Sequence, residues 1–316
     1  MRVAILDDYQ GVASDRSDWA IIDSDIELVV FDDHLFDEQK IAERLKDFEI
    51  ICAMRERTPF PRSQLELLPN LKLLITSGMR NRGIDSNAAL DLGITVCGTP
   101  SVGHPTADLA WGLILGLARQ IPMEDRRVRS GGWQKSIGVG LQGKTLGLAG
   151  VGNLGSSMVP IAKAFGMNVI GWSQNLKDEK CIQLDIDKVG KEDLLAKSDF
   201  ISIHLILSER TRGIFGAVEL SQMKPTAYIV NTSRGPIIDE DALVSALKDE
   251  VIAGAGIDVF SVEPLPKRHP FRNLKNIIVT PHLGYVEASN YEAYFRGYAE
   301  AIRAYIDGNP VNVISG

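Results

Sequence analysis

Four residues suited to acid–base and anion chemistry each follow a short apolar run in the second half of the chain. Arg234 lies in VNTSRGPIIDE, Asp258 and Glu263 in GIDVFSVEP, and His282 in VTPHLG. Parallel strands end at one edge of an open α/β sheet, where ligands bind. A guanidinium pairs with a carboxylate through two hydrogen bonds, and a histidine exchanges protons near neutral pH beside a carboxylate that fixes its tautomer. Taken singly, these residues also have purely structural interpretations: Arg234 as a surface ion pair, Glu263 as a solvated acid and His282 as a capping or core residue. Together they favour hydride and proton transfer on a small acid.

A glycine motif upstream of these residues indicates a dinucleotide site. Gly150, Gly152 and Gly155 form GxGxxG in GVGNLG, directly after the apolar run TLGLA and before the helical pattern SSMVPIAKAFG. In this context the backbone N–H groups and the helix N-terminus face a pyrophosphate. We therefore predict that the motif, with Asn153 and Leu154 in it, binds the cofactor and is more than a tight turn.

The next apolar run, MNVIGW, ends without the acid that usually bonds the ribose 2′-hydroxyl. Ser173, Gln174 and Asn175 occupy that place, and Lys177 is near. An acid would repel a 2′-phosphate, whereas a hydroxyl, an amide and a cation accept one. No arginine follows Ser173, so use of both cofactors stays open. The sequence thus predicts that NADP(H) is preferred over NAD(H).

Apolar runs alternate with helical patterns along nearly the whole chain. The first part contains VAILDD, ELVVFD, FEIICAM, LKLLITSG and ITVCG, and the second contains TLGLAGVG, MNVIGW, DFISIHL, AYIVNTS, GAGIDVF and NIIVTPH. Several runs are apolar at consecutive positions, as in strands covered on both faces. This alternation predicts an α/β protein of two domains, each with a parallel sheet between helices.

Two helices stand out in the predicted organisation. The apolar positions from Ala107 to Ile121 fit one long helix that begins near Pro105. The C-terminal segment has an aromatic stripe at helical spacing, for which core packing is the favoured interpretation. The stripe consists of Tyr291, Tyr294, Phe295 and Tyr298.

Composition excludes several classes of function. The 316 residues carry a formal charge of −7, which disfavours nucleic acid and anionic membrane surfaces as partners. No run approaches the ~20 apolar residues of a membrane span. Three cysteines without paired spacing predict reduced thiols and a cytoplasmic protein. The five histidines show no ligand spacing, so no metal site is predicted.

Four motifs taken together resemble the D-isomer-specific 2-hydroxyacid dehydrogenase family, which includes glyoxylate/hydroxypyruvate reductases and phosphoglycerate dehydrogenases. They are GVGNLG, NTSRGPIIDEDALVSAL, AGAGIDVFSVEP and TPHLG, in the family's order. The resemblance implies two Rossmann-like, doubly wound parallel-sheet domains. A discontinuous, flavodoxin-like substrate-binding domain would comprise residues 1–98 and 285–316, and an NAD(P)-binding domain residues 99–284. It also implies a homodimer built around the helix after Gly98.

Roles for the chemical residues follow from the same resemblance. It implies that Arg234 grips the substrate carboxylate and carbonyl, that His282 is the acid/base, and that Glu263 is its carboxylate partner. It further implies that Asp258 anchors the nicotinamide carboxamide and that Thr232 contacts the cofactor.

The segment ITSGMRNRGID resembles the family's substrate loop, whose backbone N–H groups hold the substrate carboxylate. The matching positions are Met79 and Arg80, where a family glycine near Arg80 is replaced by a cation that narrows the pocket or contacts a second acidic group. Arg55 lies on a loop that binds substrate in some relatives, and a purely solvated role is the equal alternative. Ile206 replaces a common proline near the adenine, which would alter cofactor fit without touching the chemistry.

The implied activity is NAD(P)H-dependent reduction of a 2-oxo acid to a D-2-hydroxy acid, and the reverse. Two alternatives keep the fold: a non-enzymatic, NADH-sensing corepressor, whose relatives can retain the three chemical residues, and a dehydrogenase of the formate or phosphite type. The formate relatives carry an amide in place of Glu263 and the phosphite relatives a lysine in place of Met79. Both differences favour an organic 2-oxo acid, with glyoxylate, hydroxypyruvate and bulkier acids left open.

Overall fold

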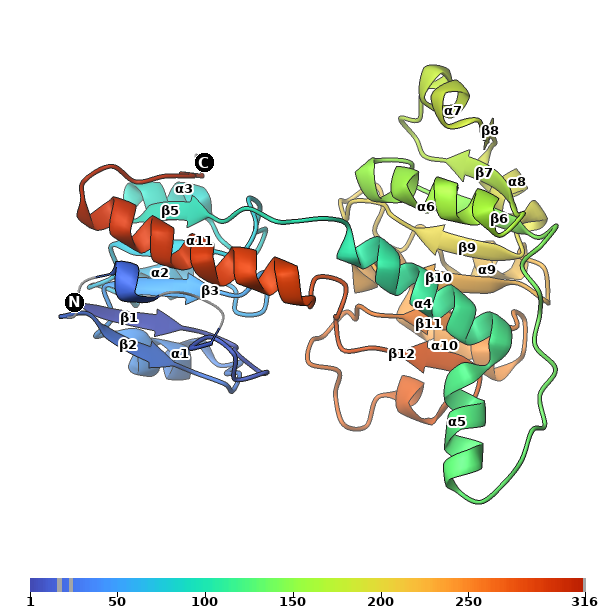
Figure 1. Cartoon of the computed structure of the whole chain (residues 1–316), viewed down its shortest axis with the longest axis horizontal. Helices are drawn as coiled ribbons and strands as arrows, with labels where there is room; N and C mark the ends of the chain where they lie inside the picture. The colour runs from blue at the N-terminus through green and yellow to red at the C-terminus, as the bar shows by residue number, and fades with distance from the viewer. Residues whose placement is uncertain (16–18, 23–24, 315–316) are drawn as a thin grey trace. The chain divides into compact units, whose positions relative to one another are not determined.

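The computed structural model describes residues 1–15, 19–22 and 25–314. The chain divides into two compact units, which we call unit 1 (Met1–Gly103 and Glu287–Gly316) and unit 2 (His104–Val286). Each contains a parallel sheet, of five strands in unit 1 and seven in unit 2 (Figure 1). The predicted α/β class with two parallel sheets is confirmed.

The sheet of unit 1 has the strand order β2-β1-β3-β4-β5. Its strands are β1 (Arg2–Ile5), β2 (Glu27–Val30), β3 (Ile50–Ala53), β4 (Leu73–Thr76) and β5 (Thr95–Gly98). Strands β3 and β4 are buried at every position, because helices cover both faces of the sheet. The order reverses between β1 and β3, which makes their carboxyl ends the expected ligand edge of unit 1.

The helices of unit 1 come from both ends of the chain. They are η1 (Trp19–Ile21), α1 (Glu38–Leu45), α2 (Arg62–Glu66), α3 (Ser86–Asp91) and the C-terminal α11 (Ala288–Ile306). Figure 1 shows α11, in red, lying beside the blue and cyan strands of this unit. The four aromatic residues of the predicted stripe are at most 4 % exposed, and Tyr298 donates a hydrogen bond to the Ala53 carbonyl at 3.0 Å. Core packing of the stripe is confirmed.

The sheet of unit 2 has the strand order β12-β11-β10-β9-β6-β7-β8. Its strands are β6 (Thr145–Ala149), β7 (Asn168–Trp172), β8 (Asp187–Lys188), β9 (Phe200–Ile203), β10 (Tyr228–Asn231), β11 (Gly254–Ile257) and β12 (Ile277–Val279). The order turns back beside β6, which pairs with both β7 and β9. The carboxyl end of β6 is therefore the switch point where a dinucleotide binds in this topology.

Helices cover both faces of this sheet. They are α4 (Pro105–Arg119), α5 (Ile121–Arg129), α6 (Asn153–Ala164), α7 (Asp178–Leu184), α8 (Lys191–Lys197), α9 (Ala217–Ser221) and α10 (Glu240–Lys248), with η2 (Gly235–Ile237) and η3 (Pro270–Asn273) in loops. One apolar core joins the sheet to α4 and α6, and the other joins it to α8, α9 and α10. In the described part of the chain, no helix has the length and apolar character to cross a membrane.

The prediction of one long helix from Ala107 to Ile121 is wrong at its end. Helix α4 stops at Arg119, because Gln120 adopts a left-handed conformation with φ 55° and ψ 33°. Pro122 then lies in the first turn of α5, where a residue without an N–H group costs nothing and its fixed φ suits a new helix. The apolar periodicity runs through Ile121 and so concealed the break.

Candidate active site

The strands that precede the predicted chemical residues end in line. Strands β10, β11 and β12 are parallel neighbours, and Asn231 pairs in register with Ile257, which pairs with Val279. The chain leaves the sheet at the same edge after each of these residues, and the loops that follow carry Arg234, Glu263 and His282. The register of three strands thus brings these loops to one edge of unit 2.

His282 and Glu263 form a close pair at this edge. The imidazole Nδ1 lies 2.6 Å from Oε2 of Glu263, while Oε1 accepts a hydrogen bond from the Phe260 N–H at 2.8 Å. The carboxylate holds the N–H on Nδ1, which leaves Nε2 to exchange a proton with a ligand. The side chains are 21 % and 33 % exposed, so a ligand can reach the pair.

A buried carboxylate organises the turn that carries His282. Asp258 accepts hydrogen bonds from the Thr280 hydroxyl at 2.6 Å, the Leu283 N–H at 2.7 Å and the Gly284 N–H at 2.9 Å. Burial raises the pKa of Asp258, against these hydrogen bonds, which lower it. His282 itself has a left-handed φ of 53°, a conformation that costs on the order of 1 kcal/mol and persists where its surroundings fix it.

Arg234 is held near the loop of Glu263. The Asn231 side-chain amide donates to the Arg234 carbonyl at 2.9 Å, and the next residue, Gly235, packs directly on the backbone of Phe260. A Cβ at Gly235 would lie 2.1 Å from the Phe260 carbonyl carbon, so only glycine allows this approach. The loops after β10 and β11 therefore pack against each other and keep Arg234 and Glu263 at the same edge.

The glycine motif forms a tight loop between β6 and α6. Gly150 has φ 99°, and a Cβ there would lie 2.7 Å from the His204 carbonyl oxygen. A Cβ at Gly155 would lie 2.0 Å from the Gly150 carbonyl oxygen, whereas one at Gly152 would meet nothing within 4 Å. Two glycines thus close the turn, and Gly152 leaves open space where α6 begins at Asn153. These residues fit a pyrophosphate at the helix N-terminus.

The end of β7 lies next to this loop, since the Gly150 N–H donates to the Trp172 carbonyl at 2.8 Å. Ser173 is half-buried, while Gln174, Asn175 and Lys177 are exposed. The nearest acid in sequence, Asp178, accepts a 2.7 Å hydrogen bond from Lys188. The strand end that faces the ribose in this fold therefore offers a hydroxyl, two amides and a lysine.

Two polar side chains, the half-buried His204 and the buried Thr232, lie at the ends of β9 and β10. Thr232 is 6 % exposed, and its hydroxyl has no hydrogen-bond partner among the described residues. His204 bonds the Ser202 hydroxyl through Nε2 at 2.9 Å, and burial lowers its pKa to about 4, so it is neutral near pH 7. Sequence reasoning missed His204, although its place directly after the apolar run DFISI was a usable signal.

The predicted substrate residues of unit 1 lie together after β3 and β4. Arg55, with φ 52°, donates from Nη1 to the Ser77 carbonyl at 3.1 Å, and its guanidinium occupies the space that a Cβ at Gly78 would need. Met79 and Arg80 follow directly and are exposed. Their backbone N–H groups bond no other described residue. A cation and two available N–H donors suit a carboxylate.

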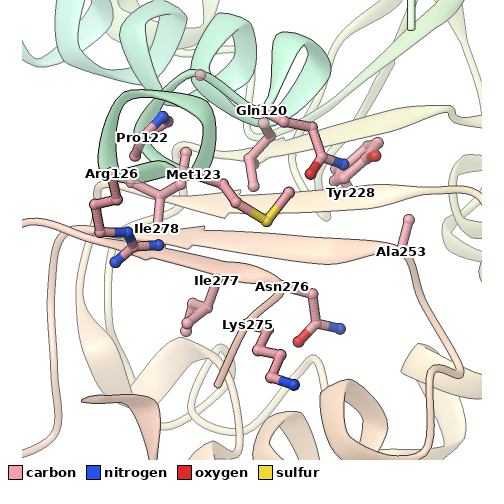
Figure 2. A pocket seen from close by; sticks show the side chains of 12 residues that line it. Gln120, Pro122, Met123, Arg126, Tyr228, Ala253, Lys275, Asn276, Ile277 and Ile278 are labelled. Atoms are coloured by element: carbon pink, nitrogen blue, oxygen red, sulfur yellow. The ribbon is translucent and has the colours of Figure 1, made fainter. Parts of the chain in front are cut away.

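A cavity of about 220 Å³ in unit 2 is lined by none of the predicted site residues. It is lined by the end of α4, by α5 and by the starts of β10 and β12, with Gln120, Met123, Arg126, Tyr228 and Lys275 around it (Figure 2). Ligands of open α/β sheets bind at the carboxyl ends of the strands, and this cavity lies at the opposite ends. It is therefore separate from the candidate active site.

Comparison with known proteins identifies the family. The model of the "D-isomer specific 2-hydroxyacid dehydrogenase, NAD binding domain" matches residues 111–284, which is more than half of the chain. This chain belongs to the D-isomer specific 2-hydroxyacid dehydrogenase family. It is accordingly an NAD(P)-binding oxidoreductase, and the glycine loop and strand ends described above lie within the matched part.

Relatives of this 2-hydroxyacid dehydrogenase extend over both units. It is 40 % identical over 262 residues to a glyoxylate reductase of Thermococcus litoralis, covering 79 % of each chain. It is 30 % identical to a hydroxypyruvate reductase of Blautia hydrogenotrophica, covering 100 % of each. A crystal structure of a phosphoglycerate oxidoreductase from Vibrio cholerae has a TM-score of 0.92 at 35 % identity, covering 98 % of this chain and 99 % of that one.

Two of the three glycines of the cofactor loop, Gly155 and Gly152, should respond differently to substitution in this dehydrogenase. Gly155→Ala places a methyl group against the Gly150 carbonyl, and we expect it to lower the free energy of unfolding by about 1–3 kcal/mol. Gly152→Ala meets open space, and we expect a loss below about 1 kcal/mol with weaker cofactor binding. Urea unfolding without cofactor and a fluorescence titration with NADPH check both. Equal stability of the two variants would contradict the close packing of Gly155.

Proposed function

We propose that this enzyme reduces a small 2-oxo acid to the D-2-hydroxy acid with NAD(P)H and catalyses the reverse reaction. The observation that carries the proposal is the His282–Glu263 pair, 2.6 Å apart, in the unit that contains the cofactor loop. The relatives named glyoxylate reductase and hydroxypyruvate reductase support a small 2-oxo acid as substrate.

In this proposal each site residue has a separate role. Arg234 binds the carboxylate and the carbonyl oxygen through its guanidinium, and the N–H groups of Met79 and Arg80 bind the carboxylate, with Arg55 supplying positive charge beside them. The bound cofactor supplies the hydride that reduces the carbonyl carbon. His282 gives the proton to the carbonyl oxygen, and water then returns a proton to its imidazole.

Two further residues hold this arrangement. Glu263 keeps the imidazole tautomer and orientation through the Nδ1 hydrogen bond. Asp258 supports the His282 turn, and we retain for it the predicted contact with the nicotinamide carboxamide, since carboxylate oxygens accept more than one hydrogen bond. Thr232 offers its buried hydroxyl to the cofactor. This role is supported because the hydroxyl has no hydrogen-bond partner among the described residues.

Removal of the proposed proton donor tests the mechanism. We expect His282→Ala to lower kcat by about 10²–10⁴-fold and to leave NADPH affinity nearly unchanged, since His282 lies outside the glycine loop. Turnover is followed by loss of reduced-cofactor absorbance with glyoxylate and hydroxypyruvate. The control is His269→Ala, because His269 also faces a glutamate, Glu240, at 3.6 Å but lies outside the site. Near-normal turnover of His282→Ala would reject the role.

We also propose that NADP(H) is preferred over NAD(H). Supporting this, the end of β7 presents Ser173, Gln174, Asn175 and Lys177 and no acid up to Asp178, which is engaged with Lys188. A hydroxyl and a lysine suit a 2′-phosphate, which an acid at this place would repel.

The cofactor preference is tested by an introduced charge. We expect kcat/KM to be higher with NADPH than with NADH, and Ser173→Asp to lower kcat/KM for NADPH by about tenfold or more, since a carboxylate repels the 2′-phosphate. Ser173→Ala, the control, removes the hydroxyl without adding charge and should lose less. A wild-type enzyme that works better with NADH would overturn the preference.

We further propose a homodimer through the helix after Gly98, α4, together with the α5 segment that follows it. Four large apolar side chains lie exposed there, namely Ile121, Val128, Trp133 and Ile137, at 52–94 %. Exposed apolar side chains gathered in one segment mark protein interfaces.

Assembly is tested by placing charges in this segment. We expect the wild type to sediment at about twice the chain mass of 34.6 kDa, and the double variant Trp133→Glu, Ile137→Glu to sediment as a monomer, because buried unpaired charges oppose association. Ile182→Glu, at a residue 78 % exposed on α7, is the control. A double variant that stays dimeric would exclude this surface.

A further inference from the structure

A buried aromatic ring lies against the imidazole of His282. The rings of Tyr285 and His282 are 5.3 Å apart between centroids and inclined at 77°, an edge-to-face contact. Tyr285 is 8 % exposed. The sequence analysis gave this tyrosine no role. It belongs neither to the glycine loop nor to the hydrogen bond between His282 and Glu263.

The hydrogen bond to Glu263 alone does not fix the imidazole. One bond at Nδ1 restrains the distance from the ring to Oε2 of Glu263, but coupled rotation about the Cα–Cβ and Cβ–Cγ bonds of His282 can still tilt the ring while that distance is kept. Such rotation moves Nε2, the atom that would meet a ligand. An edge-to-face neighbour removes this freedom, because aromatic rings prefer that geometry and close packing resists rotation.

The position of Tyr285 is itself fixed by the turn that precedes it. Gly284 donates its N–H to Oδ2 of Asp258 at 2.9 Å, and its carbonyl accepts a hydrogen bond from the Thr106 hydroxyl at 2.8 Å. Thr106 belongs to the first turn of α4. The backbone between His282 and Tyr285 is therefore tied to Asp258 and to a long helix.

We propose that Tyr285 is a positioning residue whose ring sets the plane of the His282 imidazole, so that Nε2 faces the substrate oxygen. This inference rests on the proposed proton transfer from His282. The ring carries the effect, since the observed contact is ring to ring. Phenylalanine at this position therefore preserves the ring-to-ring contact, and leucine, which has no aromatic ring, removes it.

The test compares Tyr285→Leu with Tyr285→Phe. We expect Tyr285→Leu to lower kcat by about 10- to 100-fold, because displacement of a catalytic group by about 1 Å has an effect of that order. KM and the NADPH dissociation constant should change less than threefold. The solvent deuterium isotope effect on kcat should rise, because a misplaced donor slows the proton step. Tyr285→Phe should restore the wild-type values within about threefold.

A second histidine–aromatic pair supplies the matched control. Phe271 lies 4.6 Å from His269 between ring centroids, and His269 also faces Glu240, so a histidine, an aromatic ring and a glutamate meet a second time in unit 2. Phe271→Leu removes a buried ring that also packs on Phe260 and lowers stability. Because it leaves the Tyr285–His282 contact in place, the isotope effect should stay at the wild-type value.

A spectroscopic readout keeps the inference testable without turnover. In ¹⁵N-histidine-labelled protein, we expect one Nδ1–H tautomer signal for His282 in the wild type and in Tyr285→Phe, and a broadened or shifted signal in Tyr285→Leu. An unchanged signal and kcat in Tyr285→Leu would overturn the inference. Equal losses in both variants would assign the effect to the hydroxyl and also overturn it. A wild type that reduces no 2-oxo acid would refute the proposed function instead.

Discussion

A carboxylate taken out of water is stable in a protein only when other donors replace its solvation, and at Asp258 three donors do so. A hydroxyl and two backbone N–H groups from the turn after β12 point at its two oxygens. The turn is bent around this charge, and the bend gives His282 its left-handed backbone. The His282–Glu263 hydrogen bond and the Tyr285 contact both depend on this bend. A single buried charge thereby links the end of β11 to the chemistry at the end of β12.

The same principle of construction appears in both units. Strands buried on both faces are mostly apolar, so most polar groups collect where the strands end. In unit 2 these are Thr232, Arg234 and Glu263. In unit 1 they are Arg55 and the backbone N–H groups of Met79 and Arg80, which bond no other described residue. Two of the residues at these ends, Arg55 and His282, have positive φ values.

The strands and the glycine loop could be predicted because their signals are local. A strand covered on both faces requires consecutive apolar residues, and close approach of Gly155 to Gly150 requires glycine. Strand β8 escaped prediction because Asp187 and Lys188 are exposed at the sheet edge and carry no apolar pattern. Tyr285 escaped because its contact with His282 follows from a left-handed turn, and the conformation of one backbone residue leaves no periodic trace. The roles of the site residues stay predictions that come from motif positions.

The discontinuity of unit 1 bears on how the chain is made. The ribosome makes β1 to β5 before unit 2, whereas α11, which supplies Tyr291, Tyr294, Phe295 and Tyr298 to the same core, follows unit 2. All of unit 2, residues 104–286, is translated in between, which takes on the order of 10–40 s at usual rates. For that time the apolar sheet surface that α11 covers has no intramolecular cover. The nascent chain therefore completes unit 2, which contains the cofactor loop, before α11 can complete the core of unit 1.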